Sequence, residues 1–187
     1  ATAREEAALL EPWSANGAYG GLFDGVSNIE LAGKKLALFE MGHLSDADEP
    51  LKAMLAFLIA NYTRSHMMRL PRALRKRNIF EEVARFSLVP SGKKVLRESY
   101  QQLRKYNVWN VATVQNYEQF KTSDIRGAVL GNSRMLLLMR QSDRSDVEDL
   151  SRDFPIPDTV KDAVMSHPEP EKLTGAKFSQ FTYYHTD

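Results

Sequence analysis

Two adjacent glutamates, Glu81 and Glu82, follow the short apolar run Ile79-Phe80 within residues 78–86. An apolar run of this kind is typical of the end of a strand. Carboxylates at such a place can hold magnesium and water, because one orients the waters on the metal and its neighbour polarises the water that attacks a terminal phosphate. Ionised side chains are seldom buried, however, so the residues alone leave a solvated turn as the alternative.

The elements that must position these carboxylates can be predicted from the apolar patterns on either side. We expect strands at residues 35–40, up to residue 80, and at 108–115, 134–140 and 178–184, where apolar, aromatic or β-branched residues cluster. We expect helices at 3–10, from residue 50 onward, and at 93–107, 120–132, 145–154 and 158–165. This alternation predicts an α/β domain with a mainly parallel sheet, in which ligands bind beyond the carboxyl ends of the strands. Glu40, Glu81, Glu82 and Gln115 all fall at such ends.

Local signals add detail to several of these elements. Ser45 and Asp46 place hydrogen-bond acceptors before Pro50, which suits the first turn of a helix. Leu58 lies on the apolar face of that long helix, so we expect it in the core. Ser145 has the spacing of a capping box, and its loss is expected to cost about 1 kcal/mol. The run at 134–140 is almost wholly apolar between its arginines, which predicts a strand covered on both faces.

Composition narrows the class of protein. A chain of 187 residues with 43% hydrophobic and 26% charged residues is typical of a single soluble domain. The absence of cysteine excludes disulfides and thiolate zinc sites, and the four histidines lie far apart in the sequence, which disfavours a histidine metal site. No apolar run is long enough to span a bilayer, so we expect a cytosolic protein. The first residue is alanine, which fits a processed chain, a trimmed one or a piece of a longer one.

Positive charge is concentrated in one segment although the net charge of the chain is only +1. A solvated or subunit-facing surface is the favoured interpretation, because no aromatic residues interleave with the cations to stack bases. Contact with DNA is the alternative, and it would involve Arg64, Arg69, Arg72, Arg75, Lys76 and Arg77.

Several short motifs, in order and spacing, resemble the cytoplasmic conjugation ATPases of type IV secretion systems, the TrbE and TraC kind. The resemblance runs from about residue 19 to about residue 150. It is carried by Tyr19-Gly20-Gly21-Leu22-Phe23-Asp24-Gly25, Leu38-Phe39-Glu40-Met41, Ile79-Phe80-Glu81-Glu82-Val83-Ala84-Arg85-Phe86, Gln102-Leu103-Arg104-Lys105, Val114-Gln115-Asn116-Tyr117, Gly131-Asn132-Ser133-Arg134 and Met139-Arg140-Gln141.

This resemblance implies a RecA-like, three-layer motor domain of the FtsK and HerA group, which hydrolyses ATP with magnesium. It implies a hexamer at the inner face of the bacterial inner membrane, together with other type IV secretion components. Glu81 would orient the metal through water, as the Walker B acid, and Glu82 would be the catalytic acid. Gln115 would be the polar sensor, and either Arg134 or Arg140 would reach the nucleotide of a neighbouring subunit.

The sequence departs from the family in three respects. Glu81 stands where the family usually has aspartate, and Arg75-Lys76-Arg77 is polar for a central strand. No G-x-x-x-x-G-K-[ST] segment occurs, since Gly33-Lys34-Lys35 and Gly92-Lys93-Lys94 lack both the earlier glycine and the final hydroxyl. Backbone amides and a lysine that hold phosphates are therefore missing, so we expect ATP and magnesium to bind poorly to this chain alone.

We therefore expect the carboxyl-terminal part of a longer ATPase, active only together with its amino-terminal portion, and a RecA-like domain that is incomplete here. Residues 1–187 would form one domain, with an entry helix and loop at 1–33, a core at 34–165 and a terminal extension at 166–187. The alternative function is a non-catalytic DNA-binding or protein-binding module of the same machinery. A small-molecule enzyme that uses Glu81 and Glu82 directly as acid and base is a third interpretation, which an enclosed apolar pocket would support.

Overall fold

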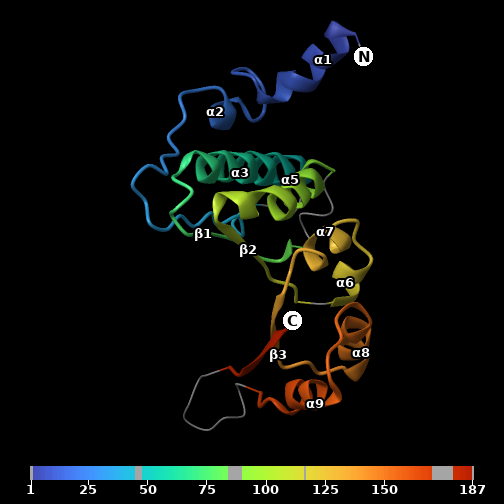
Figure 1. Ribbon diagram of the computed structural model, residues 1–187. Coiled ribbons are helices and arrows are strands. Elements are labelled where there is room, and N and C mark those ends of the chain that lie inside the picture. Colours follow the sequence, from blue (N-terminus) through green and yellow to red (C-terminus); the bar gives the residue numbers. More distant parts are fainter. Residues whose placement is uncertain (1, 45–47, 84–89, 116, 170–178, 187) are drawn as a thin grey trace. The chain divides into compact units, whose positions relative to one another are not determined.

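The computed structural model describes residues 2–44, 48–83, 90–115, 117–169 and 179–186 (Figure 1). Contacts divide the chain into two compact units, Ala1–Leu55 and Ala56–Asp187. The predicted boundaries at residues 33 and 165 remain predictions. Among the helices in the described ranges, none combines the length and the apolar character that crossing a bilayer requires.

Short helices dominate the first unit. Helix α1 (Ala3–Leu10) begins with a capping box, in which Thr2 and Glu5 each bond the backbone of the other. A 3₁₀ helix, η1 (Glu11–Trp13), follows it, and α2 (Gly20–Phe23) comes after a turn. The indole of Trp13 stacks on Tyr19, with ring centroids 4.6 Å apart. Gly20 is buried against the backbone of the preceding turn, where a side chain would not fit.

The prediction of a strand at residues 35–40 is wrong. These residues form no strand, and Leu36 and Leu38 are 85% and 83% exposed. A strand needs a neighbour for its backbone hydrogen bonds, and none of the described strands pairs with this segment. Glu40 therefore does not lie at the end of a strand.

The predicted long helix is α3 (Glu49–Arg69), with Pro50 in its first turn. Its expected capping residues Ser45 and Asp46 lie outside the described part of the chain. Leu51 is buried, whereas Leu58 is 42% exposed, so the prediction that Leu58 lies in the core is wrong. The apolar positions of α3 extend around more than one side of the helix, and the sequence does not indicate which side is covered.

The second unit contains a βαβ arrangement. Strand β1 (Lys76–Phe80) pairs in parallel with β2 (Val108–Ala112), and α5 (Pro90–Gln102) and the 3₁₀ helix η2 (Leu103–Tyr106) lie between them in the chain. The predicted strand before Glu81 is therefore confirmed, and the one at 108–115 ends earlier, at Ala112. The polar start of β1 is accommodated because the amine of buried Lys76 donates to the carbonyl of Pro71, 3.0 Å away.

The core of this unit is formed by β1, α5 and two short helices. Helices α6 (Tyr117–Lys121) and α7 (Arg126–Leu130) replace the single helix predicted at 120–132. The break falls at Thr122-Ser123-Asp124, whose side chains favour turns over continued helix. One cluster of buried residues joins these elements: Phe80, Val83, Leu96, Tyr100, Phe120, Ile125 and Val129.

The rest of the second unit contains a separate antiparallel pair. Strand β3 (Met135–Met139) pairs with β4 (Phe181–His185), and α8 (Arg144–Asp153) and α9 (Asp158–Ser166) lie between them in the chain. The prediction that residues 134–140 are covered on both faces is wrong, because Leu137 is 59% exposed. Asp143, not Ser145, caps α8, since its carboxylate accepts the backbone N–H of Ser145 at 2.8 Å.

Candidate functional site

The two predicted acids, Glu81 and Glu82, follow the carboxyl end of β1, and the predicted sensor, Gln115, lies in the loop after β2. The two strands are parallel, and Phe80 lies opposite Ala112. The residues that follow them therefore leave the same edge of the sheet, with Glu81 and Glu82 on one chain segment and Gln115 on the other. Glu81 directly follows β1 as predicted, Gln115 lies three residues beyond the end of β2, and Glu40 does not follow a strand.

Hydrogen bonds from Thr113 hold the turn that contains Glu81 and Glu82. Its backbone N–H donates to the carbonyl of Phe80, and its own carbonyl accepts the N–H of Val83, both at 3.0 Å. Its hydroxyl oxygen accepts the N–H of Glu82, also at 3.0 Å. No local sequence pattern indicates Thr113, because positions 113 and 82 meet only through the pairing of the two strands.

The backbone of Glu82 is held in the left-handed region, with φ of 52°. A residue with a side chain pays roughly 1–2 kcal/mol for this conformation, which glycine adopts without that penalty. The hydrogen bond from Glu82 to Thr113 and the complete burial of Val83 hold the turn in place. Strained conformations that are held from both sides are frequent at functional sites, so Glu82 is a candidate for more than a structural role.

The donors at this edge suit a hard cation. The carboxylates of Glu81 and Glu82 and the hydroxyl of Thr113 are all oxygen donors, the type that magnesium prefers. Glu81 is exposed and Glu82 is half-buried, so both carboxylates can be hydrated. Within the described ranges, no three or more His, Cys, Asp or Glu side chains gather where a metal could bind. The oxygen donors at this edge are thus of the type that magnesium takes as ligands.

Gln115 lies two residues before α6, a helix that a polar network holds against α8. The hydroxyl of Tyr117 donates to Asp153 on α8, and Nε of Arg126 donates to the same carboxylate at 3.0 Å. Burial raises the pKa of the Tyr117 phenol, so this group stays a donor at neutral pH. Lys121 reaches Asp149 on α8 at 2.5 Å. The network fixes α6 against α8, and no short-range sequence pattern predicts it because its partners are 27 to 36 residues apart.

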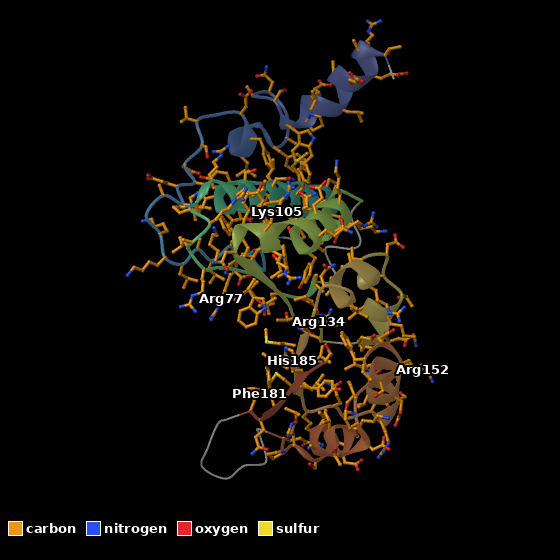
Figure 2. All side chains as sticks on the ribbon, in the orientation of Figure 1. Arg77, Lys105, Arg134, Arg152, Phe181 and His185 are labelled. Atoms are coloured by element: carbon orange, nitrogen blue, oxygen red, sulfur yellow. The ribbon has the colours of Figure 1, made fainter. Side chains whose placement is uncertain are left out.

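The two candidate arginines flank β3 and therefore belong to the other sheet. Figure 2 shows Arg134 at the end of the β3–β4 pair near His185, with Phe181 at the other end. Arg140, which follows β3, donates to the carbonyl of His167 at 2.8 Å and pairs with Glu169 at 2.9 Å. Glu81, Glu82 and Gln115 thus lie in segments that follow the paired strands β1 and β2, whereas Arg134 and Arg140 flank β3 of the other sheet.

Comparison with known proteins defines the class to which this fold and site belong. The model of the TraG P-loop domain family matches residues 5–178, so the chain belongs to that family. The chain is also 30% identical over 139 residues to Protein TraC of Escherichia coli (strain K12), which confirms the predicted resemblance to the conjugation ATPases of type IV secretion. The family and the parallel β1–β2 pair also confirm the α/β, RecA-like fold class.

The match to TraC covers 72% of this chain and 16% of TraC. No solved structure matches the chain. The family is named for its phosphate-binding loop, yet the G-x-x-x-x-G-K-[ST] pattern is not found in this sequence. What this chain shares with the family therefore lies outside that loop.

Proposed function

We propose that this chain supplies the acidic, water-activating part of the active site in a hexameric ATPase that powers conjugative transfer or type IV secretion. The observation that carries the proposal is the pair Glu81-Glu82 at the carboxyl end of β1, next to the loop of parallel β2 that contains Thr113 and Gln115. Membership of the TraG P-loop family supports ATP and magnesium as the ligands of the complete site. The protein would work at the cytoplasmic face of the inner membrane, with other type IV secretion components as its partners.

In this mechanism each side chain has a separate task. Glu82 accepts a hydrogen bond from the attacking water and polarises it, and Thr113 fixes the backbone from which Glu82 projects. Glu81 would orient water on the metal, and Gln115 would contact the reacting phosphate from the loop that follows β2. Magnesium, when bound with ATP, neutralises charge on the phosphates. Residues outside this chain would hold the phosphates, because the phosphate-loop pattern does not occur in it.

An arginine from a neighbouring subunit would complete the site by stabilising the charge that develops in phosphoryl transfer. Arg134 and Arg140 are the candidates. Arg140 would first have to leave Glu169 and the carbonyl of His167, so its use requires a change at the end of β3. Subunit-mixing experiments with Arg134→Ala and Arg140→Ala would show which variant lowers the turnover of its neighbour.

The proposal is tested by Glu82→Gln in the complete ATPase. Loss of a general base lowers turnover by roughly 10²–10⁴-fold, and ATP affinity should change little because the carboxylate acts on water. Glu30→Gln, at an exposed position of the first unit, is the matched control and should keep full turnover. Unchanged hydrolysis in Glu82→Gln would remove the catalytic assignment and leave a non-catalytic assembly module as the function.

A further inference from the structure

A basic surface lies at the amino-terminal ends of β1 and β2, away from the strand ends that carry the glutamates. Residues 70–80 and 99–117 contain no aspartate or glutamate. The exposed cations of these two segments are Arg72, Arg75, Arg77, Arg104 and Lys105. We call these five residues, together with Tyr106 and Trp109, the basic–aromatic surface.

The structure changes which cations of the basic segment can meet a partner. Lys76 is buried, and its amine is bonded to a backbone carbonyl. Arg64 pairs with Glu98 at 3.2 Å and bonds Gln102 at 2.7 Å, so its charge is balanced within the unit. Residues 99–117 contribute two other exposed cations, Arg104 and Lys105, which are distant in sequence from the basic segment.

The two segments form one continuous surface. The N–H of Lys76 donates to the carbonyl of Asn107 at 3.0 Å, and the side-chain amide of Asn107 donates to the carbonyl of Ala73 at 3.4 Å. Asn107 has φ of 57°, a conformation that asparagine tolerates better than most residues. These bonds hold residues 73–76 beside the turn that leads from η2 into β2.

Aromatic rings lie among these cations, although none occurs in the basic segment itself. The guanidinium of Arg72 is 5.1 Å from the ring centroid of Tyr106, and the amine of Lys105 is 5.5 Å from the same centroid. The guanidinium of Arg77 is 5.2 Å from the ring centroid of Trp109, its partner in the strand register. Aromatic side chains from a second segment therefore accompany the cations in the folded chain, although none interleaves with them in the basic segment.

One face of the β1–β2 pair is open within the described residues. Along β1, Lys76 and Phe80 are buried, whereas Arg77 is exposed and Ile79 is 63% exposed. Trp109 is 46% exposed on the same face as its partner Arg77. Figure 2 labels Arg77, in β1, and Lys105, in η2. The indole is thus accessible beside a cation, and the two segments that carry this pair contain no acidic residue.

We propose that the basic–aromatic surface binds single-stranded nucleic acid. The five cations would contact phosphates, and Tyr106 and Trp109 would stack on unpaired bases, with their neighbouring guanidinium groups adding cation–π contacts. Paired bases in a duplex present no open ring face, so single strands should bind more tightly. This function goes beyond ATP hydrolysis and does not depend on it, since the surface lies at the opposite ends of the strands from Glu81 and Glu82.

Fluorescence anisotropy with a labelled oligothymidylate, titrated with this chain without nucleotide, tests the proposal. Binding should weaken as salt rises, and the logarithm of the association constant should fall with log[salt] at a slope of about −0.7 for each phosphate neutralised. Trp109→Leu should weaken binding by about 10-fold or more through lost stacking, while the salt slope stays unchanged. Replacing both Arg77 and Lys105 by glutamine should instead reduce the magnitude of that slope.

Arg152→Gln on α8 is the charge control, and Trp13→Leu in the first unit is the aromatic control; both should bind like the parent chain. Far-UV circular dichroism and the urea midpoint would show that Trp109→Leu is folded. Absence of binding at low salt would overturn the proposal, as would equal affinity for a duplex. An unaltered affinity in Trp109→Leu, or binding to anionic vesicles without binding to the oligonucleotide, would also contradict it. None of these results bears on hydrolysis, so the proposed ATPase function is tested separately.

Discussion

Glycine substitutions at the two adjacent glutamates should have unequal effects on stability. Glu82 has φ of 52°, whereas Glu81 has a negative φ. Glycine at position 82 removes the penalty of the left-handed conformation, which stabilises the folded chain by roughly 1–2 kcal/mol. It also raises the conformational entropy of the unfolded chain, which destabilises the folded chain by about 0.5–1 kcal/mol. These two backbone terms alone change the free energy of unfolding of Glu82→Gly by about 0 to +1.5 kcal/mol. Glu81→Gly gains no such relief and should lose about 0.5–1 kcal/mol.

Urea unfolding of the parent chain and the two variants, followed by far-UV circular dichroism, measures this difference. Glu82→Gly should be the more stable variant by about 1–2 kcal/mol, with equal dependence on urea in all three proteins. The bond from the backbone N–H of residue 82 to Thr113 is kept in both variants, so it does not enter the comparison. Equal destabilisation by the two substitutions would refute the left-handed turn. The expected result would show that a glutamate occupies a position where glycine is better for folding, as is frequent where a side chain serves function.

Three other predictions concern Thr113, Tyr117 and the residue that caps α8. Thr113→Val should lower turnover of the complete ATPase, because it removes the hydroxyl that accepts the N–H of Glu82. Thr113→Ser keeps this hydroxyl and should keep the turnover of the parent protein. Equal turnover in the two variants would exclude a positioning role for the hydroxyl. Tyr117→Phe should cost about 0.5–1.5 kcal/mol in urea unfolding, because a side-chain hydrogen bond between α6 and α8 is lost, and an unchanged midpoint would contradict that bond. Asp143→Ala should lower the urea midpoint more than Ser145→Ala does, and the reverse order would restore Ser145 as the cap. The backbone N–H and then the hydroxyl of Ser145 hold the pKa of Asp143 below its usual range, so the effect of Asp143→Ala should be present at neutral pH and fade as pH falls below about 4.

The parts of the fold that depend on local pattern could be predicted from the sequence. Strand β1 and the exit of Glu81 and Glu82 from it follow from a short apolar run, and α3 follows from helical spacing after Pro50. The parallel pairing of β1 with β2 was expected from the alternation of strands and helices. Of these elements, β1 and β2 are the ones that place the candidate site.

Features that depend on non-local pairing could not be predicted. Residues 35–40 have the composition of a strand but have no partner among the described strands. Thr113 reaches Glu82 across 31 residues, and Arg77 meets Trp109 across 32, so only the strand register shows either contact. At the start of α8, Asp143 and Ser145 both have capping side chains, and local spacing alone does not decide between them.

The central claim, that Glu82 activates the hydrolytic water, is tested most directly by a structure of the complete ATPase with magnesium, ADP and a fluoride analogue of the transferred phosphoryl group. We expect a carboxylate oxygen of Glu82 about 2.6–3.2 Å from the water in line with that group, with the backbone N–H of Glu82 still on Thr113. Such a distance would support Glu82 as the water-polarising carboxylate. A different carboxylate on that water, with Glu82 directed into solvent, would contradict the account.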